Sequence, residues 1–344
     1  MNQHRAQLRE QLRRILAGEI ASGNENACQL TVICRGETVA DLSVGSEPNA
    51  LFPIFSAGKP MLAALALRLV ERGVLRLNTR VAELWPEFSA PDKREITLEH
   101  LLSHRAGMYL LPRSTRSEIA DWALMCRRVA EMSPRTPAGA QCRYHPLTFA
   151  WLVGHTLELA AGRPLPEMMR DEIVRPLGLQ GELFFGTDAD AEPRLVPVDD
   201  ALSPVRPSWL AEMMGDPVLR RCCIPSFNTV ASARGVAGFY AGVRGKLLSP
   251  EFFDFATGKL FRADDDPPRP GSWENFALGF VLGGPESDRG MFRGHGGAAG
   301  SEGFLMPSAD LAYGFVKNRQ RTDFTCHPVR DRISEALGIP VRHW

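Results

Sequence analysis

A serine and a lysine that could share a proton lie three residues apart in the segment Ser56-Ala57-Gly58-Lys59. This segment stands at the start of 60–72, where the apolar pattern predicts a helix, so both side chains face one side of it. A serine hydroxyl needs a base, and a lysine kept out of water can hold a pKa low enough to act as one. Taken alone, the motif is more typical of an N-cap serine beside a solvated lysine. The small number of lysines, five in 344 residues, and the apolar residues before Ser56 weaken that interpretation and favour a catalytic pair.

Two further segments carry groups that could complete this chemistry. Tyr144-His145-Pro146 precedes a predicted helix at 147–161, and the Tyr144 phenol could pass a proton to or from Ser56. A tyrosine that only fills the core is the alternative. The run Gly294-His295-Gly296-Gly297-Ala298 is rich in glycine, so its backbone can approach a ligand closely and present the Ala298 N–H to a developing oxyanion. Taken alone, this run is typical of an ordinary bend.

Strand patterns lie at both ends of the chain, and helical patterns lie between them. Strands are predicted at 29–34, 38–44, 277–282, 303–306 and 311–316. Helices are predicted at 60–72, 97–104, 147–161, 166–174, 231–241 and 328–337, with a short one opened at 249–251 and an amphipathic one before Gly23. We therefore expect an α+β fold in which 1–52 and 270–344 form one antiparallel sheet flanked by helices, and 53–269 form an inserted, mainly helical domain. The three chemical segments would meet at the seam between these domains.

Composition restricts the function classes. The 40 basic and 40 acidic side chains cancel, which removes the electrostatic footprint of a nucleic-acid or anionic-membrane binder, and no stretch is apolar enough to span a bilayer. The seven cysteines are scattered without a C-x-x-C pair and fit reduced thiols. Because residues 1–23 are amphipathic and rich in arginine, we expect no signal peptide and a cytoplasmic location. A small molecule is the expected partner, and nothing in the sequence reports the oligomeric state.

Two histidines on one predicted helix, His100 and His104, have a spacing that could suit metal ligands. No third ligand accompanies them, and the glutamate of an H-E-x-x-H motif is missing. We interpret both as structural residues and predict no metal site.

The order and spacing of the chemical segments resemble the serine β-lactamase and penicillin-binding protein superfamily, above all its branch of class C β-lactamases, esterases and D-aminopeptidases. Ser56-Ala57-Gly58-Lys59 is similar to the S-x-x-K motif, Tyr144-His145-Pro146 occupies the Tyr-x-Asn slot, and His295-Gly296-Gly297 occupies the Lys-Thr-Gly slot. The segments 96–104, 175–179 and 301–318 strengthen the resemblance, which covers roughly residues 28–340.

This resemblance implies a β-lactamase-like fold and a two-step acyl transfer that needs no metal or organic cofactor. Ser56 would attack an ester or amide carbonyl, Lys59 and Tyr144 would manage the proton, and the backbone N–H groups of Ser56 and Ala298 would form the oxyanion hole. Substrate contacts are expected from His145, Asn228, His295, Gly296 and Gly297. A structural role is the alternative for His145 and Asn228.

Departures from the family motifs favour an esterase. Pro146 has no amide donor where the motif's asparagine holds the acylamino side chain of a β-lactam. His295 is expected to be charged only part of the time, where the motif's lysine assists recognition of a carboxylate. We therefore expect a serine hydrolase that acts on a carboxylic ester or amide and is not an efficient β-lactamase. A biosynthetic acyltransferase that uses an alcohol or amine acceptor, and a non-catalytic ligand-binding relative, are the alternatives.

Overall fold

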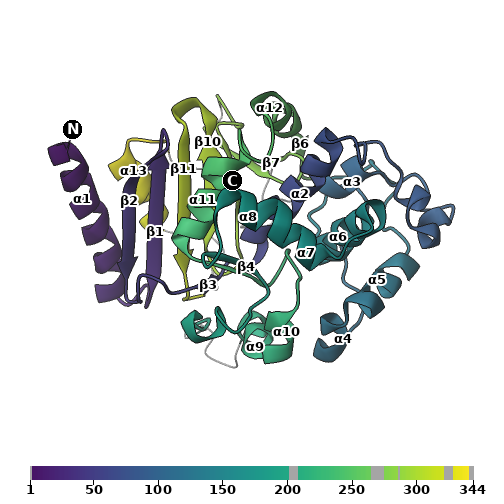
Figure 1. Ribbon diagram of the computed structural model, residues 1–344, viewed down its shortest axis with the longest axis horizontal. Coiled ribbons are helices and arrows are strands. Elements are labelled where there is room, and N and C mark those ends of the chain that lie inside the picture. Colours follow the sequence, from purple (N-terminus) through teal and green to yellow (C-terminus); the bar gives the residue numbers. More distant parts are fainter. Residues whose placement is uncertain (1, 201–207, 265–274, 286, 321–327, 341–344) are drawn as a thin grey trace.

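An antiparallel sheet joins the two ends of the chain (Figure 1). The computed structural model describes residues 2–200, 208–264, 275–285, 287–320 and 328–340. Within these residues the sheet has eight strands in the order β2-β1-β11-β10-β9-β8-β7-β6. Their bounds are β1 Cys28–Cys34, β2 Glu37–Val44, β6 Phe261–Arg262, β7 Asn275–Phe276, β8 Val281–Gly283, β9 Phe292–Gly296, β10 Glu302–Met306 and β11 Leu311–Lys317. The first and last strands, β1 and β11, pair directly with each other.

Local sequence explains the β1–β2 hairpin. Its two-residue turn consists of Arg35 and Gly36, which have positive φ values of 52° and 75°. This backbone conformation matches the right-handed twist of two strands joined by a tight turn. The hairpin then places β1 between β2 and β11, where most of its side chains are buried.

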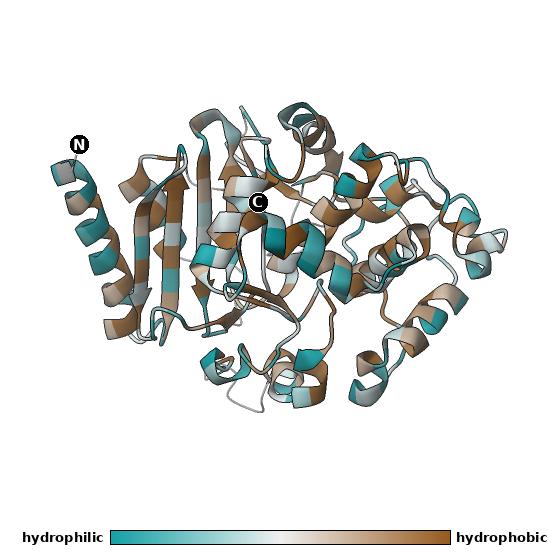
Figure 2. Ribbon diagram, in the orientation of Figure 1, coloured by the Kyte–Doolittle hydropathy of each residue, from teal (hydrophilic) through white to brown (hydrophobic). Residues whose placement is uncertain are grey.

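Helices cover both faces of the sheet. α1 (Asn2–Ala21) and α13 (Pro328–Leu337) pack on one face, and α11 (Ala233–Val243) packs on the other. Side chains alternate along β11, so Tyr313 and Phe315 join the apolar cluster of α1 and α13 while Ala312 and Val316 join the larger cluster on the α11 side. Figure 2 shows hydrophobic residues concentrated in the strands, whereas hydrophilic and hydrophobic residues alternate along α1.

The rest of the chain is mainly helical. It contains α2 Lys59–Glu71, α3 Leu98–Leu102, α4 Arg116–Ala120, α5 Trp122–Glu131, α6 Thr148–Ala161, α7 Leu165–Met169, α8 Arg175–Leu177, α9 Trp209–Gly215, α10 Pro217–Arg221 and α12 Pro250–Gly258. A second sheet, of three short strands in the described residues, lies in the order β3-β5-β4, with β3 Phe52–Pro53, β4 Leu183–Phe185 and β5 Thr229–Ala231. This small sheet stands beside the segment that leads into α2.

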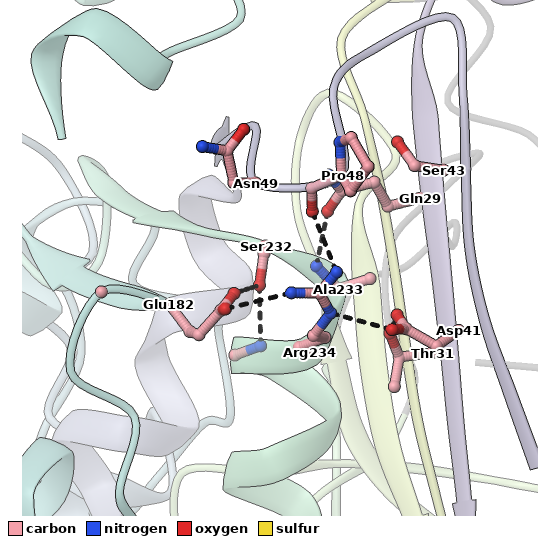
Figure 3. Close-up of polar contacts among 12 residues, drawn as sticks. Gln29, Thr31, Asp41, Ser43, Pro48, Asn49, Glu182, Ser232, Ala233 and Arg234 are labelled. Carbon is pink, nitrogen blue, oxygen red and sulfur yellow. Dashed lines mark hydrogen bonds and ion pairs between the residues drawn. The ribbon is translucent and has the colours of Figure 1, made fainter. Parts of the chain in front are cut away.

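The start of α11 is tied to both parts of the molecule (Figure 3). Ser232 caps the helix with its side chain and also hydrogen-bonds Glu182, which precedes β4. Arg234 forms ion pairs with Asp41 on β2 at 2.9 Å and with Glu182 at 3.3 Å. Through Glu182 and Asp41, these contacts fix the small sheet relative to the large sheet.

The predicted fold class is confirmed, and most predicted strands and helices are present with their ends shifted by a few residues. The predicted strand 277–282 is wrong, because two strands, β7 and β8, flank a turn there. Gly279 adopts a φ of +80° in that turn, and the Ala277 N–H donates to the Phe280 carbonyl oxygen at 2.8 Å.

The predicted domain boundary also differs from the structure. α11 packs on the large sheet and β6 extends it, although both lie within the predicted helical domain of 53–269. The sequence pattern identified α11 as a helix but carried no sign of the layer to which the helix belongs, because that depends on the strands it meets.

The six cysteines in the described residues are free thiols, as predicted, and Cys326 lies outside them. None of the helices in the described ranges is long and apolar enough to cross a bilayer. The cytoplasmic location stays a prediction.

Candidate active site

Ser56 and Lys59 lie side by side where a short 3₁₀ turn, Phe55–Gly58, runs into α2. Lys59 Nζ is 2.9 Å from Ser56 Oγ and donates to the Ser226 carbonyl oxygen at 3.1 Å. The helix can begin here because Pro60 stands in its first turn, where a missing N–H leaves no hydrogen bond unmade. The structure therefore brings together the two side chains that the sequence spacing paired.

The Lys59 amine is enclosed by the protein and has no exposed surface. Burial holds its pKa well below the ordinary value of 10.5, because the charged form loses its hydration. A neutral amine keeps a lone pair, so Nζ can accept the Ser56 hydroxyl proton across the 2.9 Å that separates the two atoms.

The backbone just before Ser56 is strained. Phe55 has a φ of +49°, a conformation that costs a bulky residue on the order of 1–3 kcal/mol. Its buried ring packs against Phe227 with the centroids 5.8 Å apart, which helps to hold the turn. Ser56 keeps 9% of its surface exposed whereas Lys59 keeps none, so a substrate would reach the hydroxyl and not the amine.

Tyr144 joins this pair from the loop that precedes α6. Lys59 Nζ lies 5.0 Å from the centre of the Tyr144 ring. Burial raises the pKa of the phenol well above 10, and its hydrogen bond with Ser56 works in the opposite direction. Tyr144 is therefore a neutral phenol at pH 7, suited to relaying a proton and not to acting as a phenolate base.

The end of β9 forms another side of the site. His295 is buried, its ring centroid lies 5.9 Å from that of Tyr144, and its Nδ1 is 2.6 Å from the Gly296 carbonyl oxygen. Burial, and next the neighbouring Lys59, hold the pKa of His295 well below 6.5. The imidazole is therefore neutral, which corrects the partial charge expected from the sequence.

Gly297 allows β9 to approach the segment that enters Ser56. A Cβ at this position would overlap the carbonyl oxygen of Ile54, so the backbones could not pass this closely with any other residue. The Gly297 N–H donates to the Ser301 carbonyl oxygen at 2.7 Å, which closes the bend. The backbone of Gly297 and Ala298 thus lies beside the strained turn that carries Ser56.

Two side chains that were predicted to contact the substrate, His145 and Asn228, instead form hydrogen bonds with the protein's own backbone. His145 Nε2 accepts from the Met108 N–H at 3.1 Å, and its Nδ1 donates to the Arg143 carbonyl oxygen at 2.7 Å. Burial lowers the pKa of His145 to about 4. Both ring nitrogens therefore bond to backbone, which corresponds to the structural alternative for this residue.

Asn228 is likewise buried and bonded to its own loop. Its Nδ2 donates to the carbonyl oxygens of Leu219 and Cys222, at 2.7 Å and 2.5 Å, and its Oδ1 accepts from the Ile224 N–H at 2.9 Å. Both amide hydrogens are used, so the structure does not bring a free Asn228 donor to the site. The side chain instead fixes the loop that supplies the Ser226 carbonyl to Lys59.

Two residues of this group were not predicted as part of the site. The Ser226 contribution is a backbone carbonyl, which no side-chain motif reports. His104 was interpreted as structural, yet its ring lies 4.9 Å from that of Tyr144, centroid to centroid. His100, which lies on α3 ahead of His104, caps the N-terminus of that helix together with Thr97. Within the described residues, no three His, Cys, Asp or Glu side chains are grouped as metal ligands.

Comparison with known families agrees with this geometry. A family model described as Beta-lactamase matches residues 12–336. The chain belongs to the beta-lactamase family of serine hydrolases. The resemblance predicted from the three motifs is therefore confirmed.

Named members of the beta-lactamase family include esterases. The chain is 29% identical to the esterase/beta-lactamase LipL of Mycobacterium tuberculosis over 296 residues, which cover 77% of this chain and 68% of LipL. It is 31% identical to esterase EstB of Burkholderia gladioli over 196 residues, which cover 50% of this chain and 48% of EstB. Among solved structures, a family VIII carboxylesterase superposes with a TM-score of 0.84 at 25% identity, and the match covers 96% of each chain.

Proposed function

We propose that this member of the beta-lactamase family hydrolyses a carboxylic ester through an acyl-enzyme on Ser56. The observation that carries the proposal is the desolvated Lys59 amine, 2.9 Å from the Ser56 hydroxyl oxygen. A neutral amine at that distance can take the hydroxyl proton as the oxygen attacks. Esterases among its relatives, LipL and EstB, support the choice of an ester as substrate.

The proposed reaction has two steps. Ser56 Oγ forms a bond to the ester carbonyl carbon while its proton moves to Lys59, and the backbone N–H groups of Ser56 and Ala298 stabilise the oxyanion, each by about 3 kcal/mol. The tetrahedral intermediate then expels the alkoxide, which takes a proton relayed from Lys59 by Tyr144 and leaves as the alcohol. In the second step water attacks the acyl carbon and gives a proton to the same pair. The bond from that carbon to Ser56 Oγ then breaks, Oγ takes the proton back, and the carboxylic acid leaves.

The neighbourhood of Tyr144 supports esters over β-lactams. Pro146 offers no hydrogen-bond donor to an acylamino side chain. His295 is held neutral by burial, so it offers no full positive charge to the carboxylate of a β-lactam. An ester with an apolar acyl group has neither an acylamino side chain nor a carboxylate, so it needs neither contact.

The test compares the two substrate classes on one enzyme. We expect steady turnover of a short-chain p-nitrophenyl ester, with kcat/KM at least about 100-fold above that for a chromogenic cephalosporin. Intact-mass analysis during turnover should show the added acyl mass on the chain. Efficient hydrolysis of the cephalosporin with slow ester turnover would contradict the ester proposal. A single acylation without release would favour the non-catalytic alternative.

The pH dependence should report the Lys59 amine. Activity requires the neutral amine, so kcat/KM should rise with pH as Lys59 loses its proton and then level off. Because burial lowers the pKa of Lys59, this rise should lie well below pH 10.5. His104, His145 and His295 are neutral at pH 6.5 and above, so they should add no step near their ordinary pKa.

Rates with a p-nitrophenyl ester, corrected for spontaneous hydrolysis, will give this profile. His155→Gln serves as the control, because that ring pairs with Glu158 on α6 and not with the residues around Ser56. The control should leave the profile unchanged. A rise centred near pH 10.5 would contradict the lowered pKa of Lys59, and a step near pH 6.5 would show that another group governs the reaction.

A further inference from the structure

Tyr144 lies in a stretch, 141–147, that has neither helix nor strand structure. Backbone N–H groups in such a stretch need acceptors outside a regular ladder, and a buried amide left without one costs free energy. The N–H groups of the residues just before and just after Tyr144 both donate to the same residue. The Arg143 N–H donates to the His104 carbonyl oxygen at 2.9 Å, and the His145 N–H donates to His104 Nδ1 at 3.2 Å.

The His104 ring also touches Tyr144 itself. The two rings meet edge to face, with centroids 4.9 Å apart and planes at 65°. On its other sides the imidazole contacts the rings of Phe149 at 5.1 Å and Phe276 at 4.9 Å. His104 is 2% exposed, so its position is set by packing as well as by hydrogen bonds.

The backbone of His104 is unusual as well. Its φ is +58°, a left-handed conformation that is uncommon outside glycine and that asparagine, aspartate and histidine adopt more often than other side chains. This conformation presents the carbonyl oxygen and the ring of one residue to the same loop. Burial, followed by the neighbouring His145, Lys59 and His295, lowers the pKa of the ring well below 6.5, which keeps the Nδ1 lone pair available as an acceptor.

We propose that His104 is a positioning residue, which holds the Tyr144 phenol against Ser56 and Lys59 by accepting the N–H groups of Arg143 and His145. This inference rests on the proposed function, in which Tyr144 relays the proton. His104 contacts the Tyr144 ring and the amides on either side of it, so its effect on the reaction runs through the position of Tyr144. A shift of about 1 Å in such a group can cost 100-fold in rate.

Two variants separate the acceptor from the backbone strain. His104→Gly and His104→Asn both tolerate a positive φ, but only asparagine keeps an acceptor, Oδ1, near the place of Nδ1. We expect His104→Gly to lower kcat for the p-nitrophenyl ester about 10- to 100-fold with little change in KM. His104→Asn should retain most of kcat. An equal loss in the folded Asn variant would overturn the proposal, and this comparison does not require the Gly variant to fold.

A double-mutant cycle with Tyr144→Phe separates positioning from a general structural role. If His104 acts through the phenol, His104→Gly should lower kcat in the wild-type background and have little further effect once the hydroxyl is gone. Additive losses would overturn the proposal. His100→Ala is the matched control on α3, the helix that ends just before His104, because it removes the side chain that accepts the Thr97 N–H and should lower the melting temperature without lowering kcat.

The cycle also tells two failures apart. A large loss in Tyr144→Phe with none in His104→Gly would overturn the positioning role and leave the proposed function standing. An unchanged kcat in Tyr144→Phe would remove the proton relay through Tyr144, and the positioning role with it.

Discussion

Ser56→Ala is expected to remove ester turnover and acylation while leaving the fold intact. The substitution deletes one oxygen at a turn that is held by Phe55, Gly297 and the start of α2, so no packing contact of consequence is lost. Losing the nucleophile in a unit of this kind costs on the order of 10⁶-fold in kcat. Steady-state rates and intact mass after incubation with a p-nitrophenyl ester will measure both effects.

Ser43→Ala provides the comparison for this variant. Ser43 lies on β2 and bonds the Ser46 carbonyl oxygen at 2.9 Å, remote in the fold from α2. It should acylate and turn over as the wild type does. An acyl adduct on the Ser56→Ala chain, or turnover near the wild-type rate, would place the nucleophile elsewhere.

Lys59→Met is expected to lower kcat by on the order of 10³–10⁴-fold, because it removes the base but fills the same apolar space. The substitution should at the same time spare the stability of the fold. Unfolding exposes Lys59 to water, where its pKa returns to the ordinary value, so below that pKa the unfolded chain binds the proton of this amine more strongly than the folded chain does. The buried amine thus lowers the free energy of unfolding at every pH below its unfolded pKa.

Thermal melts at pH 7 and ester kinetics will test the two halves of this prediction. Lys246→Met, at an exposed position, should change neither the melting temperature nor the rate by much. A Lys59→Met variant that kept its activity would contradict the role of the amine. A variant that failed to fold would show that the hydrogen bond to Ser226 outweighs the cost of burial.

The secondary structure followed from local patterns where segments were long. Helix α2, the β1–β2 hairpin and α13 have their own periodicity, caps or turn residues, and these features do not depend on the rest of the fold. Strands β6, β7 and β8 contain only two or three residues each, too few to show an alternating pattern. They form strands because they pair in succession with β9 at the edge of the sheet, so their structure depends on tertiary contacts and not on local sequence.

The sequence could predict which side chains meet where those residues lie close together along the chain. Ser56 and Lys59 share one helical turn, so their contact is local, whereas Tyr144 came from the order of the family motifs. His145 and Asn228 could not be assigned in the same way, because buried backbone groups compete for polar side chains in loops. The role of His104 could not be predicted either, because the amides that it accepts, those of residues 143 and 145, lie about 40 positions further along the chain.

The direct pairing of β1 with β11 sets an order of events during synthesis. The apolar hairpin of residues 28–44 leaves the ribosome early, but the strand that covers its inner edge is made only when residues 311–317 appear. Until then the nascent chain carries an open strand edge, which invites pairing with other chains. Newly made molecules should therefore depend on chaperones during translation, and chains that terminate before residue 311 should aggregate instead of accumulating as a folded fragment.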